Sequence, residues 1–336
     1  MKLYCIDDQF GIDALKLVEK EVPKPGHKQV LVRMKAASVN YRDILMIAGK
    51  YNSRLQRPRV PFSDGAGEVI EVGPDATRWK VGDRVLSTFF QQWPSGRITP
   101  EAAHSALGGE IDGVMAEYVL FSQDGLVPIP EHLSYEEGAT LPCTGVTAWH
   151  ALTVGGLTCG DTVLTLGTGG VSVFAVQLAT ATGAKVIGTS SSEAKLARLS
   201  QMGVAFGINY RTFPDWDKKV LECTDGKGVD RVIEVGGAGT LSKSMKAVRI
   251  GGHISLIGVL TGQTGEVNPL PAVMKSIRIQ GIFVGSKAMF MALNRALTAH
   301  QIKPVIDRVF SFDEVREALH YQESQAHFGK VVISFS

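Results

Sequence analysis

Cysteine is scarce in this 336-residue chain, and no two of the four cysteines stand close enough for a C-x-x-C pair or a zinc knuckle. We therefore predict no disulfide framework and no structural metal, which favours a reducing cytosol. An excess of charge is also missing, because 35 Lys and Arg stand against 33 Asp and Glu. This balance gives no electrostatic case for a nucleic acid or a membrane surface as partner. Long apolar runs and a secretory leader pattern are absent too, so we expect a cytoplasmic protein.

Glycine, by contrast, is plentiful, at 37 of 336 residues. The glycines follow no G-X-Y period, which excludes a collagen-like chain. The length suggests about two domains. Before residue 130, short apolar runs are bounded by Gly and Pro, as in Gln29–Ala37 (QVLVRMKAA) and Ala116–Phe121 (AEYVLF). Such runs predict the strands of a small barrel or sandwich.

From Ser134 onward the pattern changes to strands that alternate with helices. Apolar runs at Thr162–Leu166 (TVLTL), Lys185–Thr189 (KVIGT) and Val229–Val235 (VDRVIEV) are separated by residues with helical spacing. This alternation predicts βαβ units and a doubly wound parallel sheet, so the fold class is α/β. The tail from about residue 286 ends in another strand pattern, Lys330–Phe335, and on its pattern alone it fits either domain.

A glycine-rich loop follows the first of these strands. It reads Gly167-Thr168-Gly169-Gly170-Val171-Ser172 and opens a helix. In a dinucleotide-binding fold, such glycines make a tight turn and let a pyrophosphate approach the backbone at the helix N-terminus. Ser172 stands where the G-x-G-x-x-G pattern has its last glycine, so a turn without a ligand is the alternative. The setting among βαβ units favours a cofactor site formed by Gly167, Gly169, Gly170 and Val171.

The end of the second strand bears on the choice of nicotinamide. An NAD site has an acid there for the ribose 2′-hydroxyl, whereas this chain has Thr189-Ser190-Ser191-Ser192. Hydroxyls and a nearby cation suit a 2′-phosphate, so Ser190, Ser191 and Lys195, with Tyr210 and Arg211 beyond the third strand, favour NADPH. Ser190 and Glu193 also match a capping box for the next helix, and both interpretations can hold together.

Several motifs together resemble those of a known family, the medium-chain dehydrogenases/reductases, and within it the zinc-free branch of quinone oxidoreductases and enoyl reductases. The resemblance covers nearly the whole chain and rests on five motifs in order: Ala37–Asp43 (ASVNYRD), Asp64–Val69 (DGAGEV), Val81–Val85 (VGDRV), Leu141–Gly145 (LPCTG) and the Gly167–Val171 loop.

The resemblance implies a GroES-like catalytic domain, residues 1–130 and 286–336, around a Rossmann NADP(H)-binding domain, residues 131–285. It implies homodimers joined by the edge strand Arg278–Val284. It further implies cofactor contacts from Thr147, Gly236, Gly258, Val284 and Lys330, the last of these near a phosphate. A threonine inside a helix that bonds its own backbone is the alternative for Thr147.

The resemblance also bears on metal. Zinc alcohol dehydrogenases of this family bind catalytic zinc through Cys, His and Cys, and the matching positions here hold Asn40, Ser63 and Cys143. Asn and Ser are poor zinc ligands, and one thiolate cannot hold the metal alone. The stretch 86–113, where the family carries its structural zinc, contains no cysteine. We therefore predict no metal.

Without a Lewis acid, reduction of an activated double bond is easier to explain than oxidation of an alcohol. Hydride would add to the β-carbon of an enone, enal, enoyl compound or quinone, and hydrogen-bond donors would stabilise the developing enolate. The resemblance points to Tyr51 as proton donor, with Asn40 as a donor in the pocket and Asp43 orienting its neighbours. Packing is the alternative role for Tyr51, and a structural hydrogen bond is the alternative for Asp43. The alternative functions are a zinc-free alcohol or carbonyl oxidoreductase and a non-catalytic, crystallin-like NADPH-binding protein.

Overall fold

The computed structural model describes residues 1–262 and 264–335. The chain divides into two compact units: unit 1 comprises Met1–Val146 and Val284–Ser336, and unit 2 comprises Thr147–Phe283. The first boundary lies later than the expected residue 130. The reason is that helix α3 (Tyr135–Ala139) packs on strands β3 (Gln29–Val39) and β4 (Asp64–Val72) of unit 1. The second boundary lies close to the expected one at 285.

Unit 1 is built on a seven-stranded sheet in which β14-β15-β3-β4-β5-β7 are neighbours and β6 pairs with β3. Its pairs are antiparallel apart from β14 and β15, which run parallel. A separate hairpin pairs the first two strands. The remaining strands of unit 1 are β1 (Lys2–Cys5), β2 (Lys16–Glu19), β5 (Arg84–Ser87), β6 (Tyr118–Ser122), β7 (Leu126–Pro128), β14 (Ile306–Ser311) and β15 (Lys330–Ser334).

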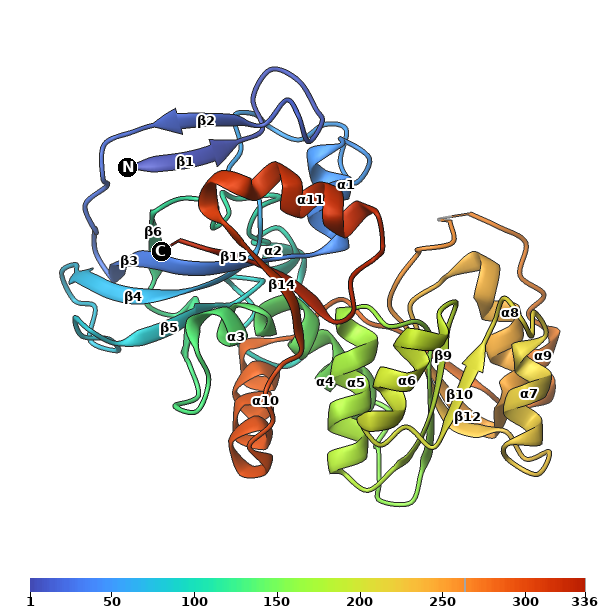
Figure 1. Cartoon of the computed structure of the whole chain (residues 1–336). Helices are drawn as coiled ribbons and strands as arrows, with labels where there is room; N and C mark the ends of the chain where they lie inside the picture. Colours follow the sequence, from blue (N-terminus) through green and yellow to red (C-terminus); the bar gives the residue numbers. More distant parts are fainter. Residues whose placement is uncertain (263, 336) are drawn as a thin grey trace. The chain divides into compact units, whose positions relative to one another are not determined.

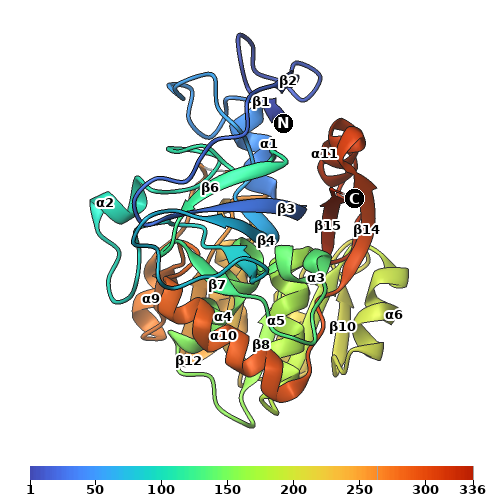
Figure 2. The same cartoon turned by 90° about the vertical axis from the view of Figure 1, so that its left-hand side faces the viewer.

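The C-terminal tail completes unit 1, because β15 pairs antiparallel with β3. Helix α11 (Val315–Glu323) lies beside β14 and β15 (Figure 2) and buries Val315, Ala318 and Leu319 in the core of this unit. The other helical segments of unit 1 are α1 (Tyr41–Ile47), α2 (Pro100–Ala103), the π-helical turn η1 (Leu141–Gly145), α10 (Lys287–His300) and the 3-10 turn η2 (Phe312–Glu314).

Unit 2 is a six-stranded, fully parallel sheet in the order β10-β9-β8-β11-β12-β13. The order reverses at β8, so the sheet is wound outward in both directions, as predicted for a Rossmann-type α/β fold. Helices α4–α6 lie on one face and α7–α9 on the other (Figure 1). The strands are β8 (Thr162–Thr165), β9 (Lys185–Ser190), β10 (Phe206–Asn209), β11 (Val229–Glu234), β12 (Val248–Leu256) and β13 (Arg278–Gly281). The helices are α4 (Val146–Thr153), α5 (Gly170–Ala181), α6 (Glu193–Gln201), α7 (Trp216–Glu222), α8 (Ala238–Ala247) and α9 (Leu270–Met274).

Strands β8, β9 and β11 begin where the apolar runs predict, because strands covered by helices on both faces need continuous apolar side chains. Val163, Leu164, Val186, Ile187, Val232 and Ile233 are all buried. In the described part of the chain, no helix is both long and apolar enough to cross a membrane.

Candidate active site

The glycine loop after β8 has the shape expected of a pyrophosphate site. Gly167 adopts a positive φ of +73°, which a residue with a side chain rarely adopts. A Cβ atom built on Gly167 or Gly169 would meet nothing within 4 Å, so open space adjoins the loop. Gly169 is the N-cap of the 12-residue helix α5 and offers no capping side chain. The backbone N–H groups of the first turn are therefore left for a ligand, and the loop fits a dinucleotide.

Ser172 shows how the loop tolerates its departure from the glycine pattern. The side chain is buried, and its hydroxyl donates to the Leu166 carbonyl oxygen at 2.6 Å. This bond ties the first turn of α5 to the end of β8. Ser172 thus keeps helix and strand close, which is the role of the last glycine in the usual pattern.

The serine run at the end of β9 differs from the predicted capping box. The N-cap of α6 is Ser192, whose Oγ accepts from the Lys195 backbone at 3.4 Å, so the Ser190–Glu193 prediction is wrong. Ser190 is instead the last, buried residue of β9, and its Oγ accepts from the Ser192 backbone at 3.2 Å. The Glu193 carboxylate accepts from the Asn209 side-chain amide. The first acid after β9 is therefore engaged in unit 2.

Other predicted cofactor residues of unit 2 have packing explanations of their own. A Cβ on Gly258 would lie 2.3 Å from the Val235 carbonyl oxygen, so glycine is required where these two chain segments touch. The Gly236 N–H donates to Glu234 at 2.8 Å. Thr147 is buried, whereas Tyr210 is 41% exposed. Cofactor contact by these residues stays a prediction.

Glu234 organises the loop after β11, and the sequence reasoning missed it. Its carboxylate is fully buried and accepts from the Gly236 and Gly237 backbones, from the Thr240 hydroxyl and from Ser244. The sequence position of Glu234 points to this role, because an acid at the end of an apolar strand needs several hydrogen-bond donors if it is to stay buried.

Val284, also a predicted cofactor residue, lies in unit 1 and has a φ of +51°. A left-handed backbone at a β-branched residue is strained, and such strain often accompanies a functional segment. Its contact with cofactor likewise stays a prediction.

In unit 1, four chain segments bring a buried cluster of polar groups together. The Lys330 ammonium, 3% exposed, lies at its centre. Its Nζ donates to the Val39 carbonyl oxygen at 2.6 Å, to Asn40 Oδ1 at 2.7 Å and to Thr144 Oγ1 at 3.2 Å. An ammonium group has three hydrogens, so all of its donors are used inside unit 1. A phosphate contact by Lys330, the role predicted from the resemblance, would require it to give up one of these bonds.

Asp64 is the second charged group of this cluster, and it was quoted in a motif but assigned no role on sequence grounds. Oδ1 accepts from the Ser63 hydroxyl at 2.6 Å and Oδ2 from the Cys143 backbone at 3.0 Å. Burial raises the pKa of the Asp64 carboxyl, and the nearby Lys330 charge opposes that rise. Burial also raises the pKa of the Cys143 thiol, so a thiolate is disfavoured there.

Asp43, a predicted catalytic residue, is a capping residue in the structure. It is 1% exposed, and its Oδ2 accepts from the Asn40 backbone N–H at 2.8 Å at the start of α1. Burial raises the pKa of the Asp43 carboxyl to about 7, although Arg42 and the Asn40 N–H act to lower it. The geometry matches the structural role that the sequence left open beside the catalytic one.

Tyr51 lies just beyond α1 and is 47% exposed. The Arg42 guanidinium stands 5.4 Å from the centroid of its ring and 4.7 Å from that of Phe89. Arg42 is itself held by a 2.9 Å bond to the Leu107 carbonyl oxygen. The Tyr51 ring is therefore supported on one side by a fixed cation while much of its surface stays open to solvent.

The residues at the family's zinc positions do not fit zinc. Asn40 Oδ1 faces the Lys330 ammonium, the Ser63 hydroxyl donates to Asp64, and the Cys143 thiol is held in its protonated form by burial. A cation already occupies the middle of the cluster, and it would repel a dication. Across residues 1–262 and 264–335, no three His, Cys, Asp or Glu side chains are grouped to hold a metal.

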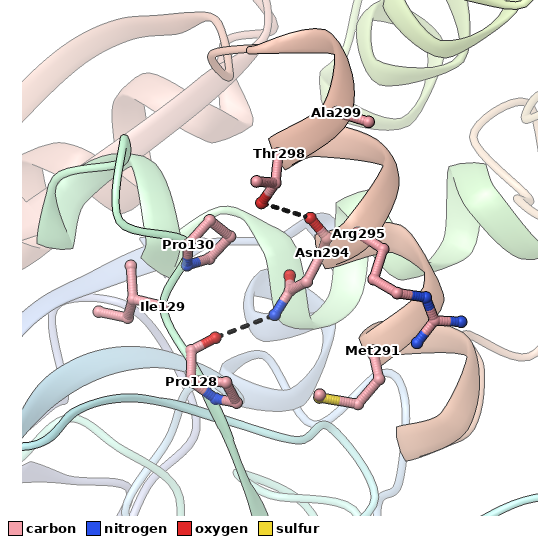
Figure 3. Close-up of a pocket in the computed structure, with 8 residues that line it drawn as sticks. All are labelled: Pro128, Ile129, Pro130, Met291, Asn294, Arg295, Thr298 and Ala299. Atoms are coloured by element: carbon pink, nitrogen blue, oxygen red, sulfur yellow. Dashed lines mark hydrogen bonds between the residues drawn. The ribbon is translucent and has the colours of Figure 1, made fainter.

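A hollow of about 360 Å³ lies elsewhere in unit 1, between α10 and the segment 128–130 (Figure 3). Asn294 Nδ2 donates to the Pro128 carbonyl oxygen and Thr298 Oγ1 to the Asn294 carbonyl oxygen, each at 2.9 Å. These groups bond within the protein, and Arg295 is the one charged residue among the described residues that line the hollow. The same lining residues include no acid–base pair that could move a proton to or from a substrate.

A parallel sheet with a glycine loop at its switch point, joined to a β-rich unit with a buried polar cluster, defines a nicotinamide-dependent oxidoreductase. Comparison with known proteins agrees. The family pattern described as "Alcohol dehydrogenase GroES-like domain" matches residues 26–131, and that described as "Zinc-binding dehydrogenase" matches residues 170–299. The chain belongs to the medium-chain dehydrogenase/reductase superfamily, whose members bind NAD or NADP.

Three relatives illustrate the range of this superfamily. A zinc-type alcohol dehydrogenase-like protein of Schizosaccharomyces pombe is 45% identical, with 98% of each chain covered. An acryloyl-coenzyme A reductase of Sulfurisphaera tokodaii is 31% identical over 95% of this chain and 96% of its own. The quinone oxidoreductase of Homo sapiens is 30% identical over 92% and 89%.

Solved structures give the same result. A putative alcohol dehydrogenase from Sinorhizobium meliloti 1021 matches with a TM-score of 0.92 and 41% identity, covering 99% of this chain and 98% of its own. A structure described as an NAD-dependent alcohol dehydrogenase matches with a TM-score of 0.92 and 34% identity over the whole of both chains. The predicted fold class and the prediction of an oxidoreductase are confirmed.

Proposed function

We propose that this protein is an NADPH-dependent reductase of quinones or activated C=C bonds that works without zinc. The observation that carries the proposal is the Asn40 amide, which is 7% exposed and has an Nδ2 that lies near the Asp64 carboxyl but meets no partner at hydrogen-bond geometry in the described part of the chain. A buried amide donor left without a partner costs about 1–3 kcal/mol, so such a donor is typical of a site that awaits an acceptor. A conjugated carbonyl oxygen is an acceptor of that kind.

The cofactor, when bound, supplies the hydride. The chain's own part is to stabilise the negative charge that develops on the carbonyl oxygen as the β-carbon takes up hydride. The Asn40 Nδ2 hydrogens would donate to that oxygen, and a preorganised donor of this kind typically lowers the barrier by about 3–4 kcal/mol. Tyr51, exposed and supported by Arg42, would give the proton to the α-carbon. Asp43 would act indirectly, since it holds the first turn of α1.

For the cofactor, NADPH is proposed over NADH. Hydroxyl groups follow β9 where an NAD site has an acid, and the nearest acid, Glu193, is bonded to Asn209. Lys195 stands in the first turn of α6 and supplies a cation near that strand end. The relative described as NAD-dependent keeps NADH as the alternative for the experiment to decide.

A substrate panel with both nicotinamides tests the proposal. We expect NADPH consumption with 1,2-naphthoquinone, methyl vinyl ketone or a 2-enoyl thioester, and a drop in kcat of about a hundredfold in Asn40→Ala. The control is Asn52→Ala, which removes an amide of unit 1 whose Oδ1 accepts from the Arg54 backbone in the same loop. Turnover of simple alcohols or ketones alone would favour a zinc-free alcohol or carbonyl oxidoreductase. Tight NADPH binding without turnover would favour a crystallin-like binding protein.

The proposed setting is a homodimer in the cytoplasm. Strand β13 is exposed along its length and forms the edge of the parallel sheet, so its backbone is open to pairing with a second copy. Helix α9, which precedes β13 in the chain and packs on α8, exposes Val273 and Met274 to more than 70%. An open edge strand and exposed apolar side chains are both typical of an interface.

A further inference from the structure

Lys330 determines which way the Asn40 amide faces. Nζ lies 2.7 Å from one of the two terminal atoms of that amide, and 3.2 Å from Thr144 Oγ1. Burial lowers the pKa of the Lys330 ammonium, while the nearby Asp64 and Asp43 carboxyls act to raise it and favour the charged form. An ammonium donates only, so beside it the Asn40 atom that faces Nζ is the carbonyl oxygen. If the amide were reversed, two groups of N–H donors would face each other in a buried space, at a cost of several kcal/mol.

Thr144 reinforces the same orientation. Its Oγ1 accepts from Lys330, so its own hydrogen is free to donate, and it donates to Asn40 Oδ1 at 3.0 Å. Asn40 Oδ1 therefore receives two hydrogen bonds. Burial raises the pKa of Asp64, and hydrogen bonding from the Asn40 side chain is one of the smaller effects that oppose this rise. Nδ2 nonetheless has no partner that meets hydrogen-bond geometry within residues 1–262 and 264–335.

We propose that Lys330 is a positioning residue, which through its bond to Asn40 Oδ1 and its alignment of Thr144 presents the Asn40 Nδ2 hydrogens to the substrate carbonyl oxygen. This inference rests on the proposed function. It replaces the phosphate contact predicted for Lys330 with a role inside unit 1. There the ammonium bonds the end of β3, the N-cap residue of α1 and η1, and the first two of these lie about 290 residues away in the sequence. The buried ammonium bonds Asn40 and lies close enough to Cys143 and Asp64 for their charges to act on it.

Two substitutions separate this role from a phosphate contact. Lys330→Met removes all three donors, and Lys330→Arg retains a group that can only donate. We expect Lys330→Met to lower kcat for methyl vinyl ketone about tenfold or more while the Kd for NADPH changes less than twofold, and Lys330→Arg to restore part of kcat. The matched control is Lys24→Met, because Lys24 is an exposed lysine of the same unit.

A second readout does not depend on activity. In protein labelled with ¹⁵N at asparagine, the side-chain signals of Asn40 are assigned by their disappearance in Asn40→Asp. In the wild type we expect one sharp pair of Asn40 Nδ2 proton signals, and in Thr144→Val a shifted or broadened pair. Thr144→Val keeps the Lys330 ammonium, so it can also be used if Lys330→Met does not fold. Unchanged Asn40 signals in both Lys330→Met and Thr144→Val would overturn the inference.

The outcomes also distinguish this inference from the proposed function. A wild type that reduces no substrate in the panel refutes the function, whereas the NMR comparison still reports the amide orientation. Loss of NADPH affinity with unchanged kcat in Lys330→Met would make Lys330 a cofactor ligand and overturn the positioning role. Loss of kcat at constant affinity, with partial rescue by arginine, supports it.

Discussion

Replacing Asp43 by asparagine should change how the stability of unit 1 depends on pH. The Asp43 carboxyl is fully buried, and its pKa is raised from 3.8 to about 7, chiefly by desolvation. Because the folded pKa lies above the unfolded one, the folded state binds the extra proton between these values. The stability contribution is thus complete below pH 4 and is lost as the pH rises to about 7.

The magnitude follows from the shift. At 1.36 kcal/mol per pKa unit, a rise from 3.8 to about 7 corresponds to about 4 kcal/mol of lost stability once the group is ionised. In Asp43→Asn, the new Oδ1 can still accept from the Asn40 N–H, but the new NH₂ would occupy the place of an oxygen that has no partner in the described residues. That costs about 1–3 kcal/mol at every pH. We therefore expect the variant to be less stable than the wild type near pH 4.5 and more stable by about 1–3 kcal/mol at pH 8.

Hydrogen exchange of the peptides that cover residues 29–47 is the suitable assay, because the two units need not unfold together and a global transition would mix them. Wild type and variant are compared at each pH, so that the intrinsic pH dependence of exchange cancels. Glu21→Gln, at an exposed side chain of unit 1, is the control and should show no change with pH. A stability difference between Asp43→Asn and wild type that is the same at pH 4.5 and pH 8 would refute the reasoning.

Three further predictions concern the cofactor, the proton donor and the interface. Gly169→Val fills the open space beside the loop, so NADPH binding measured by calorimetry should be lost while the melting temperature is retained; Lys195→Ala should weaken NADPH about tenfold and leave NADH unchanged. Tyr51→Phe should slow enone reduction and spare quinone reduction, since a quinone oxygen can take its proton from water; equal losses in stopped-flow rates would contradict this. Val273→Asp on α9 should yield monomers in sedimentation, whereas Val81→Asp, at an exposed valine of unit 1, should not.

The parallel sheet of unit 2 was predictable because its physics is local and repetitive. Each buried strand needs a short apolar run, and each connection needs a helix with one apolar face. The alternation of strands and helices is therefore visible in the sequence. The glycine loop was predictable for a similar reason, because its backbone shape at Gly167 restricts the residue type.

Boundaries and caps were less predictable because several local solutions compete. Ser190, Ser191 and Ser192 can each begin a helix, and the structure uses Ser192 because β9 extends through Ser190. Likewise, the helical segment 135–139 suggests the start of an α/β domain, but α3 packs on β3 and β4 of unit 1. Tertiary packing decides both which serine caps α6 and which unit α3 joins, and a short stretch of sequence does not show that packing.

Asn40 and Tyr51 could be selected from the sequence because a family motif contains them, but their surroundings could not. The Lys330–Asn40 bond joins residues 290 positions apart, and Asp64 and Thr144 come from two further segments. These partners also explain each other. Lys330 is the main charge that opposes the burial of Asp64, whereas Arg42 has that role for Asp43 and Lys330 adds a smaller effect. A lysine at position 330 is thus compatible with an amide at position 40, but it is incompatible with a metal ion bound by residues 40, 63 and 143. A variant that combines Asn40→Cys with Ser63→His should therefore bind zinc only when Lys330 is also replaced by an uncharged residue.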